Sequence, residues 1–203
     1  MIDCFALLDE PRRPWLDPDR LKQKFLGLSA QHHPDRIHGA GSAEKAAAQK
    51  VYIDLNVAYQ CLADPKSRLR HLLELELKAK PQEIQQIPED LMEVFVAVGL
   101  LTRKIDAFLK EKSAMASPLL RIQLFERNQD CTDELTQLQR RITARHDQVL
   151  TEIQKVDADW VASEPGSPLR MTLLKRLEEC YRLLSYFSRW TNQLQERLVQ
   201  LAV

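Results

Sequence analysis

Apolar residues recur at helical spacing along the first eighty residues of the chain. Asp17 and Pro18 precede Leu21, Phe25 and Leu28, which follow one another at i, i+4 and i+7. This pattern predicts an amphipathic helix with Asp17 as its N-cap and Pro18 in its first turn.

A second helix is predicted after the loop 36–42, with Ser42 as a candidate cap, and the dipeptide Asp64-Pro65 should end it. Its apolar face is formed by Val51, Leu55, Ala58 and Leu62. Shorter helices are predicted around residues 5–8 and 67–77. Regular strand patterns are absent from the sequence, so the segment reads as all-helical.

The pattern changes to longer helices beyond Pro88. Breaks at Ser117-Pro118 and at residues 163–168 divide the rest of the chain into three helical segments, which predict an antiparallel three-helix bundle. We therefore expect an all-α protein with a small helical domain at 1–78, a linker at 79–87 and a bundle at 88–203. The apolar positions at helical spacing are Leu91, Phe95, Val98, Leu101 or Thr102, Ile105 and Phe108 or Leu109 in the first segment, Leu135, Leu138, Ile142, Val149, Ile153, Val156 and Trp160 in the second, and Leu173, Leu177, Tyr181, Leu184, Phe187, Leu194, Leu198 and Leu201 in the third.

Composition narrows the function classes. The 203 residues carry 29 basic and 29 acidic side chains, so the net charge does not favour nucleic acid or a membrane surface as a partner. The apolar run at the N-terminus contains Asp3 and does not read as a signal peptide. Apolar runs long enough to span a membrane are absent from the sequence. The expected location is cytoplasmic.

The four cysteines are Cys4, Cys61, Cys131 and Cys180. They are far apart in sequence and form no C-x-x-C pair, which favours reduced cysteines within helices over a zinc site. We therefore expect neither a metal nor another cofactor.

The tripeptide His33-Pro34-Asp35 lies between the first two amphipathic helices. Proline ends the preceding helix and disfavours α geometry at His33. Asp35 is suited to bond local backbone amides or a partner's arginine. The tripeptide therefore predicts a corner that presents an imidazole and a carboxylate.

Two chemical readings of this corner are less favoured. His33 could act as a catalytic base, but its local pattern contains no nucleophile or second base, so we do not expect an enzyme. His32, His33 and His38 could bind a metal, but thiolates do not accompany them in the loop and Asp35 is the one acid among them.

The frame around the tripeptide resembles a J-domain, the module with which J-proteins stimulate the ATPase of heat-shock-70-class chaperones. The whole chain resembles the HscB-type iron–sulfur co-chaperone family, in which a J-domain precedes a three-helix bundle. Short stretches that carry the resemblance are Cys4-Phe5-Ala6-Leu7-Leu8, Lys24-Phe25, Leu55-Asn56-Val57-Ala58-Tyr59-Gln60-Cys61-Leu62, Arg182-Leu183-Leu184-Ser185 and Gln193-Leu194-Gln195-Glu196.

The resemblance implies two binding surfaces. A chaperone would be contacted by His33, Pro34 and Asp35, with Lys22 and Lys24 as a basic face; an ordinary solvated helix face is the alternative reading of the two lysines. An iron–sulfur scaffold protein would be bound through the bundle.

The family's scaffold-binding patch begins with Leu-Met-Glu, which Leu91-Met92-Glu93 reproduces. We expect Leu91, Met92 and Phe95, with Leu183 from the last helix, to form one exposed apolar patch. The alternative is that these side chains are bundle core. The acidic run that follows in the family is replaced here by the apolar residues 96–101.

These expectations lead to a non-enzymatic co-chaperone that delivers a client, the scaffold protein, to a heat-shock-70-class chaperone. Two alternatives stay open. One is a J-domain protein whose bundle binds a different client, and the other is a structural helical protein with a chance His-Pro-Asp tripeptide.

Overall fold

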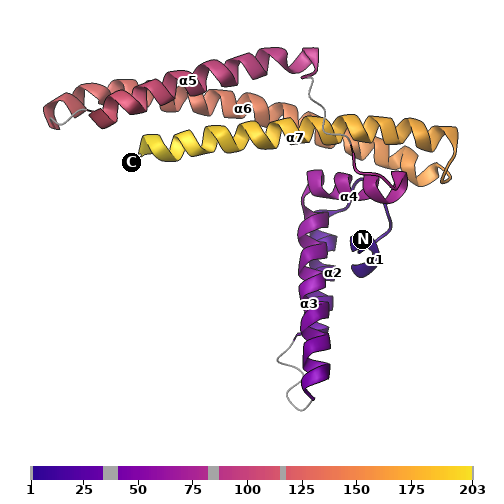
Figure 1. The fold of residues 1–203 in the computed structure, drawn as a ribbon. Coiled ribbons are helices and arrows are strands. Elements are labelled where there is room, and N and C mark those ends of the chain that lie inside the picture. Colours follow the sequence, from indigo (N-terminus) through magenta and orange to yellow (C-terminus); the bar gives the residue numbers. More distant parts are fainter. Residues whose placement is uncertain (1, 34–40, 82–86, 115–117, 203) are drawn as a thin grey trace. The chain divides into compact units, whose positions relative to one another are not determined.

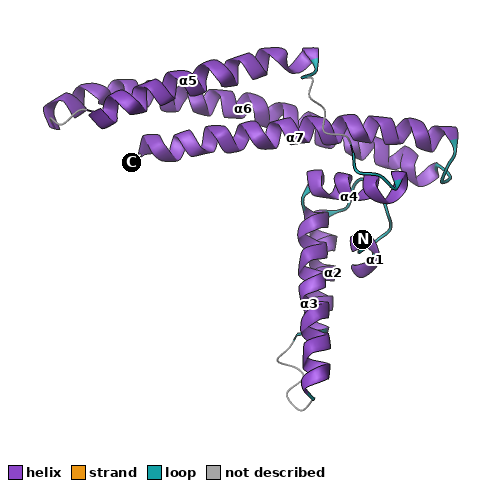
Figure 2. Cartoon of the chain, in the orientation of Figure 1, coloured by secondary structure: helices purple, strands orange, loops and turns teal. Residues whose placement is uncertain are grey.

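The computed structural model of the chain describes residues 2–33, 41–81, 87–114 and 118–202. Within these ranges every regular element is a helix, as Figure 2 shows, so the predicted all-α fold is confirmed. The elements in chain order are α1 (Cys4–Leu7), α2 (Pro18–Gln31), α3 (Ser42–Ala63), α4 (Pro65–Leu77), the 3-10 turn η2 (Glu89–Leu91), α5 (Met92–Ala114), α6 (Pro118–Ala162) and α7 (Pro168–Ala202).

Capping side chains set several helix starts. The Asp17 carboxylate accepts the backbone N–H of Arg20 at 2.9 Å, and Pro18 is the first helical residue of α2, as predicted. Asp64 caps α4 in the same way through Ser67 N at 2.8 Å. The expectation for Ser42 is wrong, because Ser42 is already helical and Gly41 occupies the cap position of α3.

The chain divides into two compact units, Met1–Gln82 with Leu150–Tyr181 and Glu83–Val149 with Arg182–Val203. The long helices α6 and α7 therefore contribute to both units. The predicted boundaries at 78 and 88 remain a prediction.

In the first unit, α2 and α3 lie side by side, and α1 contacts α3 (Figure 1). Phe25 of α2 stacks on Tyr59 of α3 with ring centroids 4.2 Å apart. The predicted face of α3 is shifted at its start, because Val51 is 38% exposed while Ala48, about one turn earlier, is buried. Residues 1–82 contribute to the core of this unit Phe5, Leu8, Leu16, Leu21, Leu55, Ala58, Leu62, Leu69, Leu72 and Leu73.

The loop between α1 and α2 is fastened by a buried carboxylate of the first unit. Asp157 of α6 accepts the Nε–H of Arg13 at 2.9 Å and the backbone N–H of Trp15 at 3.2 Å. The Asp157 side chain thus binds the guanidinium of Arg13 and the backbone amide of Trp15.

Two further side chains of the first unit bind the same loop through its carbonyls. Arg68 of α4 donates to the Pro14 carbonyl at 2.9 Å. Trp160 Nε1 donates to the Arg12 carbonyl at 2.9 Å. Residues 12–15 are therefore all bonded to helices far away in sequence.

Two ion pairs show how α5 runs relative to α6 in the bundle. Glu93 pairs with Arg141 and Lys104 with Glu134, each at 2.6 Å. The residue number of the α6 partner falls as the α5 number rises, so these two helices run antiparallel.

The direction of α5 relative to α7 follows from two other contacts. Asp106 pairs with Arg197 at 3.1 Å, and Lys112 bonds the Leu201 carbonyl at 3.5 Å, so both numbers rise together. Thus α5 runs parallel to α7 and antiparallel to α6 (Figure 1), which confirms the predicted antiparallel three-helix bundle.

Most positions of the apolar stripes in the three long helices are buried. Tyr181 and Leu198 of α7 are half-buried. Phe95 of α5 is the clear departure, because it is 43% exposed and Val94 is buried in its place.

Two helical glycines have open surroundings. A Cβ built at Gly27 of α2 or at Gly99 of α5 would meet nothing within 4 Å. Glycine inside a helix costs roughly 0.5–1 kcal/mol relative to alanine. We expect Gly27→Ala and Gly99→Ala each to raise the free energy of unfolding by about that amount, measured by urea denaturation.

Gly166 provides the control for this prediction. Its φ is +78°, in the region that side chains rarely adopt, so Gly166→Ala should lower the free energy of unfolding although its surroundings are equally open. Equal effects at all three positions would show that backbone conformation does not determine the outcome.

Candidate functional site

The predicted corner follows the end of α2. His32 closes the helix with its N–H bonded to the Leu28 carbonyl at 3.1 Å, and His33 comes next. The His33 ring meets the Tyr52 ring of α3 edge to face, with centroids 5.4 Å apart and planes at 80°. His33 is half-buried in this contact. Pro34 and Asp35 lie outside the described residues, so their roles stay predictions.

The two predicted lysines differ in their surroundings. Lys22 is exposed on α2. Lys24 is held by the segment after α1, with its ammonium 3.1 Å from Asp9 Oδ2 and 3.2 Å from Glu10 Oε1. Desolvation opposes the charge of Lys24, but the bonds and charges of Asp9 and Glu10 outweigh it and raise the pKa. Lys24 therefore has a structural role that its spacing alone did not indicate.

The predicted patch at the start of α5 is divided by the structure. Leu91 is 1% exposed, so the expectation that it lies on the surface is wrong. Met92 and Phe95 are 45% and 43% exposed, as the patch requires, and Val94 takes the core position that the helical stripe assigned to Phe95. Leu91, Val94, Val98 and Leu101 follow one another at i, i+3, i+7 and i+10, so a helix that buries this stripe leaves Phe95 at the flank of its buried face.

Two further apolar side chains extend this surface. Val96 and Leu100 are 47% and 63% exposed and follow Met92 at i+4 and i+8, so all three lie on one face. We refer to Met92, Phe95, Val96 and Leu100 as the α5 patch. Sequence reasoning missed Val96 and Leu100 because it treated the segment only as a departure from an acidic run.

Leu183 is partly exposed, and its neighbour Leu184 is buried as predicted. The parallel pairing of α5 with α7, seen at Asp106 with Arg197, places Leu183 level with residues 92–94. Leu183 is therefore at the height along the bundle that the predicted patch needs.

A hollow borders the α5 patch on the side of α6. Charged and apolar side chains share its wall, so an apolar partner bound there would meet a polar rim. Its lining residues are Ala97, Leu100, Leu101, Lys104, Glu134, Gln137, Leu138 and Arg141.

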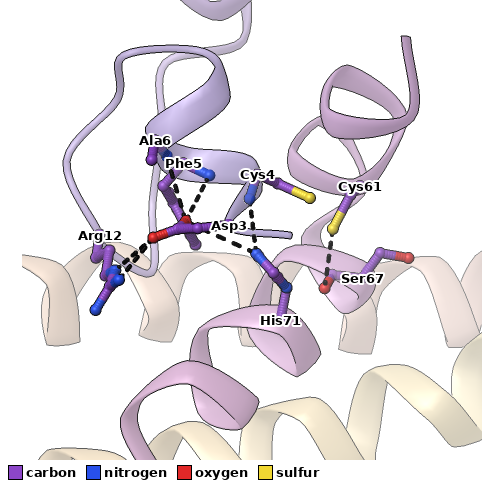
Figure 3. Close-up of polar contacts among 8 residues, drawn as sticks. All are labelled: Asp3, Cys4, Phe5, Ala6, Arg12, Cys61, Ser67 and His71. Atoms are coloured by element: carbon purple, nitrogen blue, oxygen red, sulfur yellow. Dashed lines mark hydrogen bonds and ion pairs between the residues drawn. The ribbon is translucent and has the colours of Figure 1, made fainter. Parts of the chain in front are cut away.

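Three side chains that are far apart in sequence converge in the first unit (Figure 3). Cys4 of α1, Cys61 of α3 and His71 of α4 each bring a possible ligand atom within 4.8 Å of the other two. The backbone N–H of Cys4 donates to His71 Nε2 at 3.0 Å, and the Cys61 thiol donates to the Ser67 carbonyl at 3.8 Å. We refer to Cys4, Cys61 and His71 as the Cys–Cys–His cluster.

The cluster alters the acidity of its thiols. The neighbouring Cys61 thiol lowers the pKa of the Cys4 thiol to about 5, with burial opposing the shift and His71 reinforcing it. The same contact with Cys4 raises the pKa of Cys61. Sequence reasoning found no signal for this arrangement, because the three residues share no short motif.

The described residues contain no helix long and apolar enough to cross a membrane.

Comparison with known proteins gives relatives for part of the chain. No protein-family model matches it. The co-chaperone protein HscB homolog of Paraburkholderia phymatum is 42% identical over 71 residues, which are 35% of this chain and 41% of that protein. The co-chaperone protein HscB of Proteus mirabilis is 35% identical over 75 residues, 37% of this chain and 43% of that protein. The match therefore spans less than half the length of these relatives.

Solved structures resemble the chain along most of its length. The crystal structure of human co-chaperone protein HscB matches with a TM-score of 0.63 and 18% identity, covering 96% of this chain and 81% of that one. Chaperone HscB from Vibrio cholerae matches with a TM-score of 0.50 and 24% identity, covering 95% and 99%. The predicted resemblance to HscB-type co-chaperones is confirmed, and the structural likeness supports the all-helical fold.

Proposed function

We propose that the chain is a co-chaperone that stimulates the ATPase of a heat-shock-70-class chaperone and brings it a client. The observation that carries the proposal is the His33 corner, where an imidazole follows the end of α2 and contacts Tyr52 of α3. The named relatives, themselves co-chaperones, support the same class of activity. Catalysis by this chain itself forms no part of the proposal.

In this proposal the chaperone docks on His33, Pro34 and Asp35 together with α2. Lys22 is the cation placed to face an acidic partner surface, since Lys24 is engaged by Asp9 and Glu10. Contacts through exposed charges act mainly on the rate of association and weaken as salt is added. The docking should therefore be salt-sensitive.

The client surface in this proposal is the α5 patch with Leu183. Exposed apolar side chains that gather on one helix face mark an interaction surface more often than scattered ones do. Because the same chain carries both surfaces, a bound client is presented to the chaperone at a raised effective concentration. The resemblance points to an iron–sulfur scaffold protein as the client.

A second client class is favoured by one observation. Val96 and Leu100 are exposed where the family pattern has an acidic run. A partner that matches this surface would offer an apolar helix or groove instead of basic side chains. The two client classes separate in binding assays, because binding through charged contacts weakens with added salt and binding through apolar contacts does not.

The proposal is tested first by adding the full chain to a heat-shock-70-class chaperone and measuring single-turnover ATP hydrolysis. We expect the rate to rise with chain concentration and to saturate. A rate that does not change at any concentration would leave a structural helical protein with a chance tripeptide.

The client surface is tested with the double variant Met92→Ala and Phe95→Ala. Hot-spot side chains lose about 2 kcal/mol or more of binding when truncated, so scaffold binding should weaken by at least about tenfold. Stability should change less than binding, because Met92 and Phe95 are 45% and 43% exposed and lie outside the bundle core. Binding is measured by calorimetry and stability by thermal melting of the same samples.

Phe125→Ala is the matched control for this test. Phe125 is 68% exposed on α6, close to the level at which Arg127 pairs with Glu111, and so far along the bundle from the α5 patch. The control variant should leave scaffold binding unchanged. Equal binding by the double variant and the parent chain would exclude the patch.

A further inference from the structure

The Cys–Cys–His cluster joins three helices through three side chains with metal-binding atoms. Cys4, Cys61 and His71 come from α1, α3 and α4, and their possible ligand atoms lie within 4.8 Å of one another. We propose that these three residues bind a single zinc-class divalent cation, with the fourth coordination position left to a water molecule.

The donor distances suit this assignment. Zinc is bound by thiolate sulfur at about 2.3 Å and by imidazole nitrogen at about 2.0–2.1 Å in tetrahedral sites. Ligand atoms around one such ion are therefore roughly 3.5–4 Å apart. The observed upper limit of 4.8 Å requires side-chain shifts of only about an ångström.

Charge and donor type favour zinc over harder cations. Thiolate and imidazole are ligands for zinc and related transition metals, whereas calcium and magnesium take oxygen donors. Two thiolates and a neutral imidazole balance the charge of a divalent ion. A site without net charge suits this position, because Cys4 and His71 are 7% and 6% exposed.

A route from solvent reaches the cluster. Cys61 and His71 line a surface hollow that also includes Ser67 and Glu74. An ion can therefore enter without opening the core of the unit. A fourth ligand from water would lie on the side of this hollow, as in sites with three protein ligands and one exchangeable position.

One existing contact must yield when the ion binds. The lone pair of His71 Nε2 accepts the Cys4 amide at 3.0 Å, so coordination through this atom replaces that hydrogen bond by a metal bond. Asp3 Oδ1 lies 3.9 Å from the same nitrogen, and Asp3 is held in place by Arg12, whose Nε donates to Oδ2 at 2.9 Å. The Asp3 carboxylate thus adds negative charge on the side of the imidazole that would face the cation.

A metal ion bound here would cross-link α1, α3 and α4. An ion that binds the folded chain and not the unfolded one raises the free energy of unfolding in proportion to the logarithm of its concentration. This effect is independent of any chaperone activity. The inference departs from the sequence-based expectation of no metal, which was based on the spacing of the cysteines.

The test uses the full chain, reduced and free of metal, titrated with Co²⁺ as the spectroscopic probe. We expect one equivalent to produce a thiolate-to-cobalt charge-transfer band and the intense visible bands of tetrahedral cobalt. One equivalent of Zn²⁺ should abolish both and raise the melting temperature.

Cys61→Ser is the deciding variant, because Cys61 is half-buried and serine retains a donor for the Ser67 carbonyl. Its Co²⁺ affinity should fall by more than the roughly 10- to 100-fold typical of changes outside the ligand set. Cys131→Ser, which removes a thiol outside the cluster, should bind Co²⁺ as the parent chain does.

Three results would overturn the proposal. The first is a folded, reduced parent chain without a thiolate-to-cobalt band. The second is an unchanged band in Cys61→Ser. The third is loss of the band in folded Cys131→Ser, which would place the metal elsewhere. A chain that forms a Cys4–Cys61 disulfide in air and binds no Co²⁺ when reduced gives the first of these results and identifies a thiol pair.

Discussion

His33→Gln is expected to abolish stimulation of a heat-shock-70-class ATPase while leaving the chain folded. The reason lies in the corner geometry, in which the ring is half-buried against Tyr52 but is not part of the core. An aromatic edge contact contributes about 0.5–1.5 kcal/mol, so its loss should lower the melting temperature by only a few degrees. Glutamine can still donate and accept hydrogen bonds, but it cannot reproduce the ring that a partner would contact. The measurement is single-turnover ATP hydrolysis, with helicity and melting temperature determined on the same samples.

His32→Gln is the matched control for this variant. His32 is exposed and occupies the position that closes α2, one residue before His33. The same chemical change at this position should retain most of the stimulation. If both variants lose activity equally, a general effect at the end of α2 explains the loss. If His33→Gln loses its fold together with its activity, His33 is a structural residue.

Local signals predicted the helices well because each depends on a few neighbouring residues. The carboxylate of Asp17 caps α2 through an amide three residues later, and Pro18 starts that helix. The stripes in α6 and α7 are long, so one misplaced residue does not change the predicted face. Leu184, for example, is buried beside a more exposed Leu183, as the period requires.

The start of α5 was harder to predict because two neighbouring residues fit the same apolar stripe. Val94 follows Leu91 at i+3 and Phe95 follows it at i+4, and both spacings suit one helix face. Val94 is the buried one of the two, while Phe95 is 43% exposed. Packing of α5 within the bundle determines which of the two reaches solvent, and the spacing alone does not reveal it.

Contacts between segments that are far apart in the chain could not be predicted, because they produce no periodic pattern in the sequence. Cys4, Cys61 and His71 meet because three helices pack together, and their spacing resembles no metal motif. In the sequence, Asp157 lies near other charged residues of a long helix, and nothing distinguishes it from a solvent-exposed acid. Its burial depends on a loop 142 to 144 residues away in sequence.

Asp157→Ala is expected to cause the largest loss of stability among single substitutions of charged residues in the first unit. Its side chain is 5% exposed and binds the guanidinium of Arg13 through both oxygens, while one oxygen also accepts the Trp15 amide. Removing the carboxylate leaves both donors without this partner. Breaking a buried ion pair costs about 3–5 kcal/mol, and the cost here should lie near the lower end because Arg13 is one-third exposed.

Two companion variants separate the charge from the hydrogen bonds. Asp157→Asn retains an oxygen that can accept the Trp15 amide, so its loss should be smaller than that of alanine. Asp159→Ala removes an exposed acid two residues along the same helix and should change the free energy of unfolding by no more than about 0.5 kcal/mol. Urea denaturation followed by far-ultraviolet circular dichroism gives all three values, and near-ultraviolet dichroism follows Trp15 and Trp160 at the fastened loop. If Asp157→Ala is as stable as Asp159→Ala, the loop between α1 and α2 is held by Arg68 and Trp160 without help from this carboxylate.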